Sequence, residues 1–319
     1  MRVHSNKDFF SKSRGKYFAF LALLSLLLSA CQKQGTESLP ISVWEAPSWF
    51  PEMDIPEDNA FTLSRWELGK KLFYETRLSI DHSISCASCH DPNLSFSDNK
   101  ALSPGVFNRP GTRNASMLAN IGYAPNLLRE GGIPTLEMQV LVPIQEHNEF
   151  NHNIVEIAEE LKEDDHYIQL AQKAYGEEMS AFVITRALSN FQRTLISGNS
   201  AYDQYMFLGR SNSLSAEAIA GMELFTSSRL KCSECHSGVF FTNFDFANNG
   251  LQEMYSDSGS MRLSGLESDR AVFKVPSLRN IEVTGPYLHN GSIETLMDVI
   301  DLYSNGGFDH ANKSELLQD

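Results

Sequence analysis

The feature that most constrains this chain is a five-residue pattern that occurs twice. Residues 86–90 read CASCH and residues 232–236 read CSECH, so in both places a histidine directly follows two cysteines that are two residues apart. The chain of 319 residues has five cysteines, and these two patterns leave only Cys31 outside them. If Cys31 has a role of its own, no cysteine is left over for a separate disulfide framework.

Three chemistries use a CxxC pair. Thiol–disulfide exchange expects a strand–helix–strand context, which this sequence lacks, and needs no following histidine. A zinc ion held by all four thiolates is the main alternative, but it leaves both histidines unexplained. Covalent haem uses every residue, because the thiols add to the haem vinyl groups and the histidine binds the iron. The sequence therefore predicts two c-type haems, held by Cys86, Cys89, His90, Cys232, Cys235 and His236.

The N-terminal residues predict export. Residues 12–31, KSRGKYFAFLALLSLLLSAC, run from basic through apolar to small side chains, which is typical of a secretory signal, and the apolar run is short for a membrane span. The ending LSAC resembles the lipobox of bacterial lipoproteins, so Cys31 is the expected lipidation site. An uncleaved anchor, or a plain signal with a chance cysteine, is the alternative. We expect an exported, periplasm-facing protein that meets the outer membrane only through this lipid anchor.

The net charge bears on partners. The formal net charge is −14, and 42% hydrophobic with 21% charged residues is typical of a soluble globular protein. An acidic surface argues against binding to nucleic acid or to anionic lipid, and it mildly favours a basic protein partner.

A weak repeat and helical spacing predict a mainly α fold with two cytochrome-c-like haem domains. Aligning Gly69 with Gly221 also aligns Leu72-Phe73 with Leu224-Phe225, each ahead of a CxxCH pattern. Apolar residues at helical spacing predict helices over 63–79, 153–176, 179–198 and 293–303, and the Gly-, Ser- and Asn-rich stretch 237–275 predicts mostly loop.

These patterns divide the chain into four segments. The expected segments are a lipoprotein signal over 1–31, a Pro-rich and acidic tether over 32–55, an N-terminal haem domain over 56–205 and a C-terminal haem domain over 206–319. No obvious closing helix precedes Asp319, which leaves open that the last domain is truncated.

From about Leu63 to Phe308 the chain resembles the bacterial di-haem cytochrome c peroxidases, and more closely their MauG-like branch. The resemblance implies two cytochrome-c-like α domains with their haems close together and a calcium ion between them. The stretches that carry it are LSIDHSISCASCHDP, GTRNAS, TLEMQVLVPIQEHNEF, FQRTLISGNSAYDQY, CSECHSG and FKVPSLRNIEVTGPYLHNGSIETL.

The resemblance implies a peroxide pocket at the first, peroxidatic haem. Gln139 and Glu149 match a glutamine and a glutamate of the family, and Pro143 matches the proline between them. A carboxylate can carry a proton from the inner to the outer peroxide oxygen, while an amide orients the peroxide. Without the family, both residues would be interpreted as solvated polar side chains.

The sixth position of this first haem is expected to be open. Other family members place a histidine in the loop after CxxCH, but no His or Met occurs from Asp91 to Ser116. The alternative is that His147 or His152, further along the chain, swings in as a ligand.

At the second haem, the resemblance implies Tyr303 as the ligand opposite His236. Ordinary peroxidases of this family have a methionine at this position, fourteen residues after the histidine that matches His289, whereas MauG-like enzymes have tyrosine. Tyrosinate stabilises oxidised iron and lowers the reduction potential. In the alternative, Tyr303 is a core residue and the ligand is Met254, Met261 or Met297.

The resemblance also implies calcium ligands, which are the Asn114 side chain and the main-chain carbonyls of Thr284 and Pro286. Oxygen donors suit this hard cation, although Asn and Thr in loops are more often turn formers. One position departs from the family: Arg129 stands where a tryptophan is expected between the haems. Arginine cannot be oxidised like an indole, but its guanidinium could pair with haem propionates.

The expected function is therefore that of a di-haem c-type peroxidase. It reduces hydrogen peroxide at an open, His-ligated haem, and a His/Tyr-ligated haem relays or stores oxidising equivalents. The expected partner is an electron donor, such as a small cytochrome or cupredoxin, or a protein that is itself oxidised. The alternatives are a non-catalytic di-haem electron-transfer cytochrome and a peroxide sensor.

Overall fold

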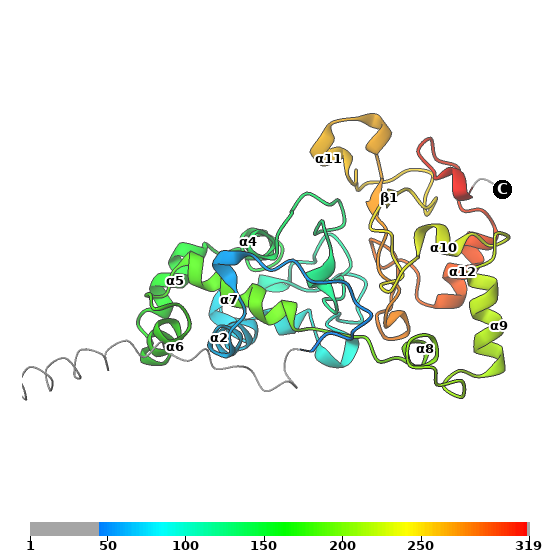
Figure 1. The fold of residues 1–319 in the computed structure, drawn as a ribbon. Helices are drawn as coiled ribbons and strands as arrows, with labels where there is room; N and C mark the ends of the chain where they lie inside the picture. Colours follow the sequence, from blue (N-terminus) through cyan, green and yellow to red (C-terminus); the bar gives the residue numbers. More distant parts are fainter. Residues whose placement is uncertain (1–44, 318–319) are drawn as a thin grey trace, which may run out of the picture. The chain divides into compact units, whose positions relative to one another are not determined.

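The computed structural model describes residues 45–317 (Figure 1). The predicted signal segment 1–31 with Cys31, and residues 32–44 of the predicted tether, lie outside the described residues. Within 45–317, no helix is both long enough and apolar enough to cross a membrane.

The described chain is mainly helical, as predicted. Its only named strands, β1 (Phe246–Ala247) and β2 (Phe273–Lys274), form a short antiparallel pair within 45–317. The helices are α2 (Leu63–Phe73), α3 (Leu136–Gln139), α4 (Leu141–Gln145), α5 (Ile154–Leu161), α6 (Asp165–Tyr175), α7 (Ala181–Arg193), α8 (Ala201–Met206), α9 (Ala216–Phe225), α10 (Cys232–Cys235), α11 (Met261–Ser264) and α12 (Leu296–Ser304).

The hydrophobic core lies within residues 68–195, in the first half of the chain (residues 45–205), where α2, α3 and α5 pack against α7 and α6 packs against α2 (Figure 1). Leu68 and Leu72 of α2 are fully buried. Gly69 permits this packing, because a Cβ at that residue would lie 1.9 Å from the carbonyl oxygen of Ala187 in α7.

The stretch 153–176, predicted as one helix, forms two helices. The helix α5 ends at Leu161, and the Asp164 side chain then accepts a hydrogen bond from His166 N (2.9 Å) as the cap of α6. Arg77 also pairs with Asp164 at 3.1 Å. An aspartate that satisfies a free backbone N–H starts a new helix more readily than it continues an old one.

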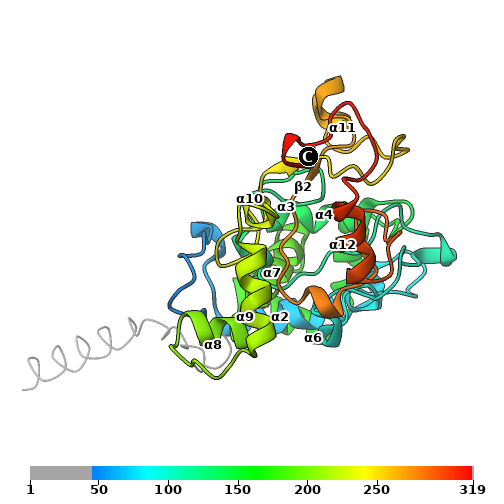
Figure 2. The same ribbon diagram turned by 90° about the vertical axis from the view of Figure 1, so that its right-hand side faces the viewer.

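The second half, residues 206–317 of the described chain, lacks an equivalent of α7. Neither α9 nor α12 contains a buried residue. Leu224 is 45% exposed, whereas Leu72, its predicted counterpart in the first half, is fully buried. Figure 2 shows α9 and α12 in this half together with α10, which carries the second CxxCH pattern.

A second repeat, with an offset of 160 residues, relates the two halves closely. The turns Ile121–Tyr123 and Ile281–Val283 are equivalent, and so are the starts of α3 and α12, each capped by a threonine side chain. Two matching hydrogen bonds join the halves. Asn114 N donates to His289 O (2.9 Å), and Lys274 N, 160 residues after Asn114, donates to Arg129 O (2.7 Å).

The described end of the predicted tether is packed. Phe50 and Met53 are buried, and the Phe50 ring lies 4.8 Å from that of Phe240.

A buried ion pair between Arg279 and Asp203 (2.8 and 2.9 Å) adds a further link between segments distant in sequence. All of the described residues fall within one contact unit, so the division at residue 205 stays a prediction.

Candidate functional site

The first CxxCH pattern forms a tight turn that fixes His90. Ser85 N donates to Ser88 Oγ (3.0 Å), which holds the 3-10 turn Cys86–Ser88. The Nδ1 atom of His90 lies 2.7 Å from Phe96 O. Because a carbonyl only accepts, Nδ1 carries the proton and Nε2 keeps its lone pair for a metal.

The second pattern, on α10, repeats this geometry. The Nδ1 atom of His236 lies 3.2 Å from Phe241 O. In both copies the accepting carbonyl belongs to a phenylalanine in the left-handed region, with φ of 61° at Phe96 and 52° at Phe241. This backbone conformation is costly for a bulky residue and is most often found at functional sites.

The titration of these residues fits haem attachment. Burial lowers the pKa of both His90 and His236, which keeps the imidazoles neutral as iron ligands require. Burial also raises the pKa of Cys86 to about 12 and of Cys89 to about 11. Neutral thiols are poor metal ligands and poor redox groups.

The arrangement does not form a zinc centre. Among residues 45–317, no group of three or more His, Cys, Asp or Glu side chains is placed to hold a metal ion. The two cysteine pairs therefore do not meet in a four-thiolate shell, whereas the second half of the chain has exposed apolar residues that suit contact with an apolar macrocycle. These residues include Leu224, Leu230, Met297, Ile300 and Phe308.

Glu149 lies beside the first CxxCH pattern. Its charge acts on the thiols of both Cys86 and Cys89. Burial, and secondly the charge of Glu146, raise the pKa of Glu149 to about 7. By accessible surface Glu149 is exposed, so its carboxyl can exchange protons with solvent, while the protein packed around it still favours the neutral form and lets it act near neutral pH.

A glycine holds the backbone of Glu149 in place. Val106 N donates to Glu149 O (2.9 Å). A Cβ at the preceding residue, Gly105, would lie 1.9 Å from Asn148 O, so only glycine permits this approach. The loop that follows the first CxxCH pattern is thereby fastened to the segment that carries Glu149.

Gln139 and Glu149 lie on one continuous segment, although no hydrogen bond joins them among the described residues. The helix α3, which ends at Gln139, is anchored to α7 by a Glu137–Arg193 ion pair (2.7 Å). Pro143 lacks the N–H that would bond to Gln139 O, and α3 accordingly breaks before α4.

The two alternative histidines have other partners. His147 is exposed and lies 3.3 Å from Asn151 Oδ1, and His152 Nδ1 accepts a hydrogen bond from Asn153 N (2.8 Å).

Tyr303 lies near the cysteines of the second pattern. Burial raises the pKa of its hydroxyl group, and the Cys235 and Cys232 thiols act in the same direction. Asn249 Nδ2 lies 3.5 Å from the hydroxyl oxygen. Tyr303 as a whole is 38% exposed, against 87% for Met254 and 65% for Met297, while Met261, the third alternative ligand, is half-buried.

The residues expected to bind calcium do not fit that ion. Asn114 Oδ1 and its main-chain oxygen accept hydrogen bonds from Arg129 Nη2 at 3.0 and 2.9 Å. A guanidinium therefore faces the one side-chain oxygen of the expected ligand set. No step of the proposed function uses calcium.

Asp98 was not predicted from the sequence. It is buried, its Oδ2 atom has no hydrogen-bond partner, and its charge acts on His90 and Cys89. The sequence could have indicated this residue, because Asp98 lies in the loop directly after the first CxxCH pattern and so stays close to His90.

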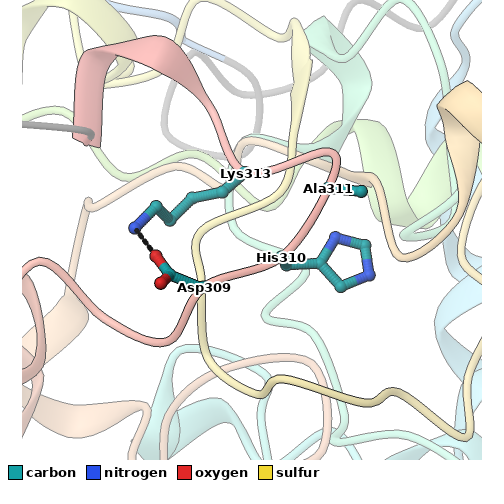
Figure 3. Close-up of a pocket in the computed structure, with 4 residues that line it drawn as sticks. All are labelled: Asp309, His310, Ala311 and Lys313. Carbon is teal, nitrogen blue, oxygen red and sulfur yellow. Dashed lines mark hydrogen bonds and ion pairs between the residues drawn. The ribbon is translucent and has the colours of Figure 1, made fainter.

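One pocket of the described chain contains none of the predicted site residues. It has a volume of about 530 Å³ and is lined by Asp309, His310, Ala311 and Lys313. Figure 3 shows the His310 ring pointing away from the Asp309–Lys313 ion pair (3.3 Å). We assign no role to this pocket.

Comparisons with known proteins agree with this geometry. The family model described as di-haem cytochrome c peroxidase matches residues 64–211. The methylamine utilization protein MauG of Methylorubrum extorquens is 35% identical over 256 residues, covering 79% of this chain and 72% of its own. The chain belongs to the di-haem cytochrome c peroxidase and MauG family. Family membership makes it an oxidoreductase and implies two c-type haems.

Two further relatives support this family. The cytochrome c551 peroxidase of Nitrosomonas europaea is 34% identical, with 74% of this chain and 71% of that protein covered. The crystal structure of a MauG-like protein associated with microbial copper homeostasis has a TM-score of 0.81 and 31% identity, covering 86% of this chain and 89% of its own. The expected MauG-like branch and the mainly helical di-haem fold are thus confirmed.

Proposed function

We propose that this protein is a MauG-like peroxidase that reduces hydrogen peroxide at the haem held by Cys86, Cys89 and His90. The observation that carries the proposal is the position of Glu149, whose pKa is raised to about 7 and whose charge acts on both cysteines of that pattern. When bound, the haem would supply a redox-active iron for the reduction of peroxide.

The chain's own residues handle the proton. The Glu149 carboxylate accepts a proton from the inner peroxide oxygen and delivers it to the outer one, and the Gln139 amide donates a hydrogen bond that orients the peroxide. Two electrons and two protons complete the conversion of one peroxide into two waters. The electrons come from a donor protein or from a protein substrate.

We propose that Cys232, Cys235, His236 and Tyr303 would hold the second haem. A phenolate oxygen favours oxidised iron, so this haem would store or relay oxidising equivalents. The burial-raised pKa of Tyr303 means that its hydroxyl ionises only when a cation takes the proton's place.

We also propose that the protein is exported through residues 1–31 and anchored by lipid at Cys31, with haem domains over 56–205 and 206–319. This arrangement would leave the haems facing the periplasm, where c-type haem is attached. Mass spectrometry of the mature N-terminal peptide would reveal the acyl mass on Cys31. An unmodified Cys31 would contradict the anchor.

The Glu149→Gln variant tests the catalytic role. We expect the holo-protein to react with peroxide about two to four orders of magnitude more slowly in stopped-flow measurements, as for the loss of a general acid–base. Glu159→Gln is the matched control, because Glu159 is 64% exposed and pairs only with Lys162 on the surface. Equal rates for Glu149→Gln and wild type would rule out the proposed role.

A further inference from the structure

Asn114 lies where the two halves of the chain meet, and each polar group of its amide already has a partner. Its Nδ2 donates to Lys100 O (2.9 Å), while its Oδ1 accepts from Arg129 Nη2 (3.0 Å). A guanidinium can only donate and a carbonyl can only accept, so these two partners fix the orientation of the amide. The Asn114 oxygen therefore faces a positive charge.

The neighbouring carboxylates are also engaged. Asp257 accepts two hydrogen bonds from Arg113 (2.6 and 2.9 Å). Glu130 pairs with Arg113 and, at 3.3 Å, with Arg262. Calcium takes about six to eight oxygen ligands, usually with carboxylates among them, and neither of these carboxylates is left for such an ion.

The 160-residue repeat offers an independent comparison. Lys274 is the counterpart of Asn114, and Asn126 is the counterpart of Pro286, whose carbonyl was expected to bind calcium. Lys274 Nζ donates to Asn126 O at 2.6 Å. In the second half of the chain, the Lys274 ammonium group therefore takes the position that corresponds to the expected calcium ion.

We propose that the Arg129 guanidinium is the resident cation at the junction of the two halves, and that the protein binds no calcium at Asn114. The guanidinium bridges the main-chain and side-chain oxygens of Asn114, which is itself bonded to His289 of the second half. A divalent ion at this position would have to displace the guanidinium or lie beside it. The proposal goes beyond the peroxidase function and does not depend on it.

The test uses the full holo-protein, purified in EGTA, with calcium chloride as the probe. Thermal unfolding is measured with EGTA or with about 1 mM calcium, a concentration that reaches even weak protein sites. Calcium content after dialysis is measured by mass spectrometry. We expect wild type to retain no calcium and its Tm to shift by less than about 1 °C, since only a bound ion raises Tm.

The variants Arg129→Gln and Arg129→Trp remove the guanidinium. We expect both to retain about one calcium and to gain several degrees in Tm with calcium, because Asn114 Oδ1 becomes available. The second variant restores the family residue, so it remains informative if the first folds poorly. Arg270→Gln is the control with the same loss of charge, since Arg270 pairs with the exposed Glu267, and we expect it to behave as wild type.

Two results would overturn the proposal. Stoichiometric calcium in the wild-type protein would show that the ion coexists with Arg129. Absence of calcium from wild type and from both Arg129 variants would show that the guanidinium is not what excludes the ion. Neither result would bear on the rate of the peroxide reaction, so the two proposals fail separately.

Discussion

Pro143 and Tyr303 occupy equivalent positions in the two halves of the chain. Each lies seven residues after the first residue of a threonine-capped helix, α3 in one half and α12 in the other. Proline has no side-chain atom that can bind iron, whereas tyrosine offers a phenol oxygen. If Tyr303 binds iron as we propose, the repeated framework supplies a ligand in one half and none at the equivalent position of the other half.

The two halves differ in structure at these equivalent positions. In the first half, the proline also breaks the helix after Gln139, and the segment continues to Glu149 beside the first CxxCH pattern. In the second half, α12 runs unbroken to Ser304 and brings Tyr303 near Cys232 and Cys235. The first half is suited to a reacting peroxide and the second to a six-coordinate haem.

The rate of the peroxide reaction should depend on the protonation of Glu149. Its pKa is raised from 4.5 to about 7, and only the carboxylate can accept a proton from peroxide. We expect the second-order rate constant to rise with pH to a plateau, with half its maximum near pH 7. The same profile measured for Glu149→Gln should be flat. A midpoint unchanged in that variant would assign the titration to another group.

The raised pKa of Glu149 also makes the stability of the folded protein depend on pH. A carboxyl with a higher pKa in the folded than in the unfolded state favours folding fully below pH 4.5, and this contribution is lost as pH rises through about 7. Glu149→Gln should remove this dependence from urea denaturation midpoints measured across that range.

Replacing Tyr303 with methionine should change the electronic properties of the second haem. A thioether is a weaker donor than a phenolate, so we expect the Tyr303→Met variant to raise one reduction potential by more than about 100 mV, within the range that axial ligands impose. Spectroelectrochemical titration measures both haems. Tyr255→Phe, which alters another tyrosine near His289 and His310, should leave both potentials in place. An unshifted potential in Tyr303→Met would mean that Tyr303 does not bind iron.

Two glycines at matching repeat positions should respond oppositely to alanine. A Cβ at Gly69 would meet Ala187 O at 1.9 Å, so Gly69→Ala should destabilise the protein by about 1–3 kcal/mol. A Cβ at Gly221 meets nothing within 4 Å, so Gly221→Ala should stabilise α9 by about 0.5–1 kcal/mol. Urea denaturation followed by circular dichroism compares the two. Equal effects would mean that α2 and α9 are packed alike.

The sequence was sufficient for features that depend on local spacing. Apolar residues at helical intervals predicted the helix before the first CxxCH pattern, which is α2, and the repeat that aligns Gly69 with Gly221 indicated a counterpart before the second, which is α9. The break between α5 and α6 was not predicted, because Asp164 reads as one more surface charge until its capping bond is seen. The strands β1 and β2 have two residues each, too few for alternation to show.

Features that depend on distant contacts were beyond the sequence. The sequence shows that Arg129 departs from the family, but not that its guanidinium bonds to both oxygens of Asn114. Likewise Glu149 is an ordinary acidic residue until the fold places it beside the cysteines and raises its pKa. These properties arise from burial and from neighbours brought in by the fold.

Electron paramagnetic resonance of the ferric holo-protein tests the central claim most directly, since it reports the coordination of both haems at once. The arrangement of Pro143 and Tyr303 predicts one high-spin haem with an open face and one low-spin haem with two protein ligands, in equal amounts. Two low-spin haems, with no high-spin signal, would contradict the account.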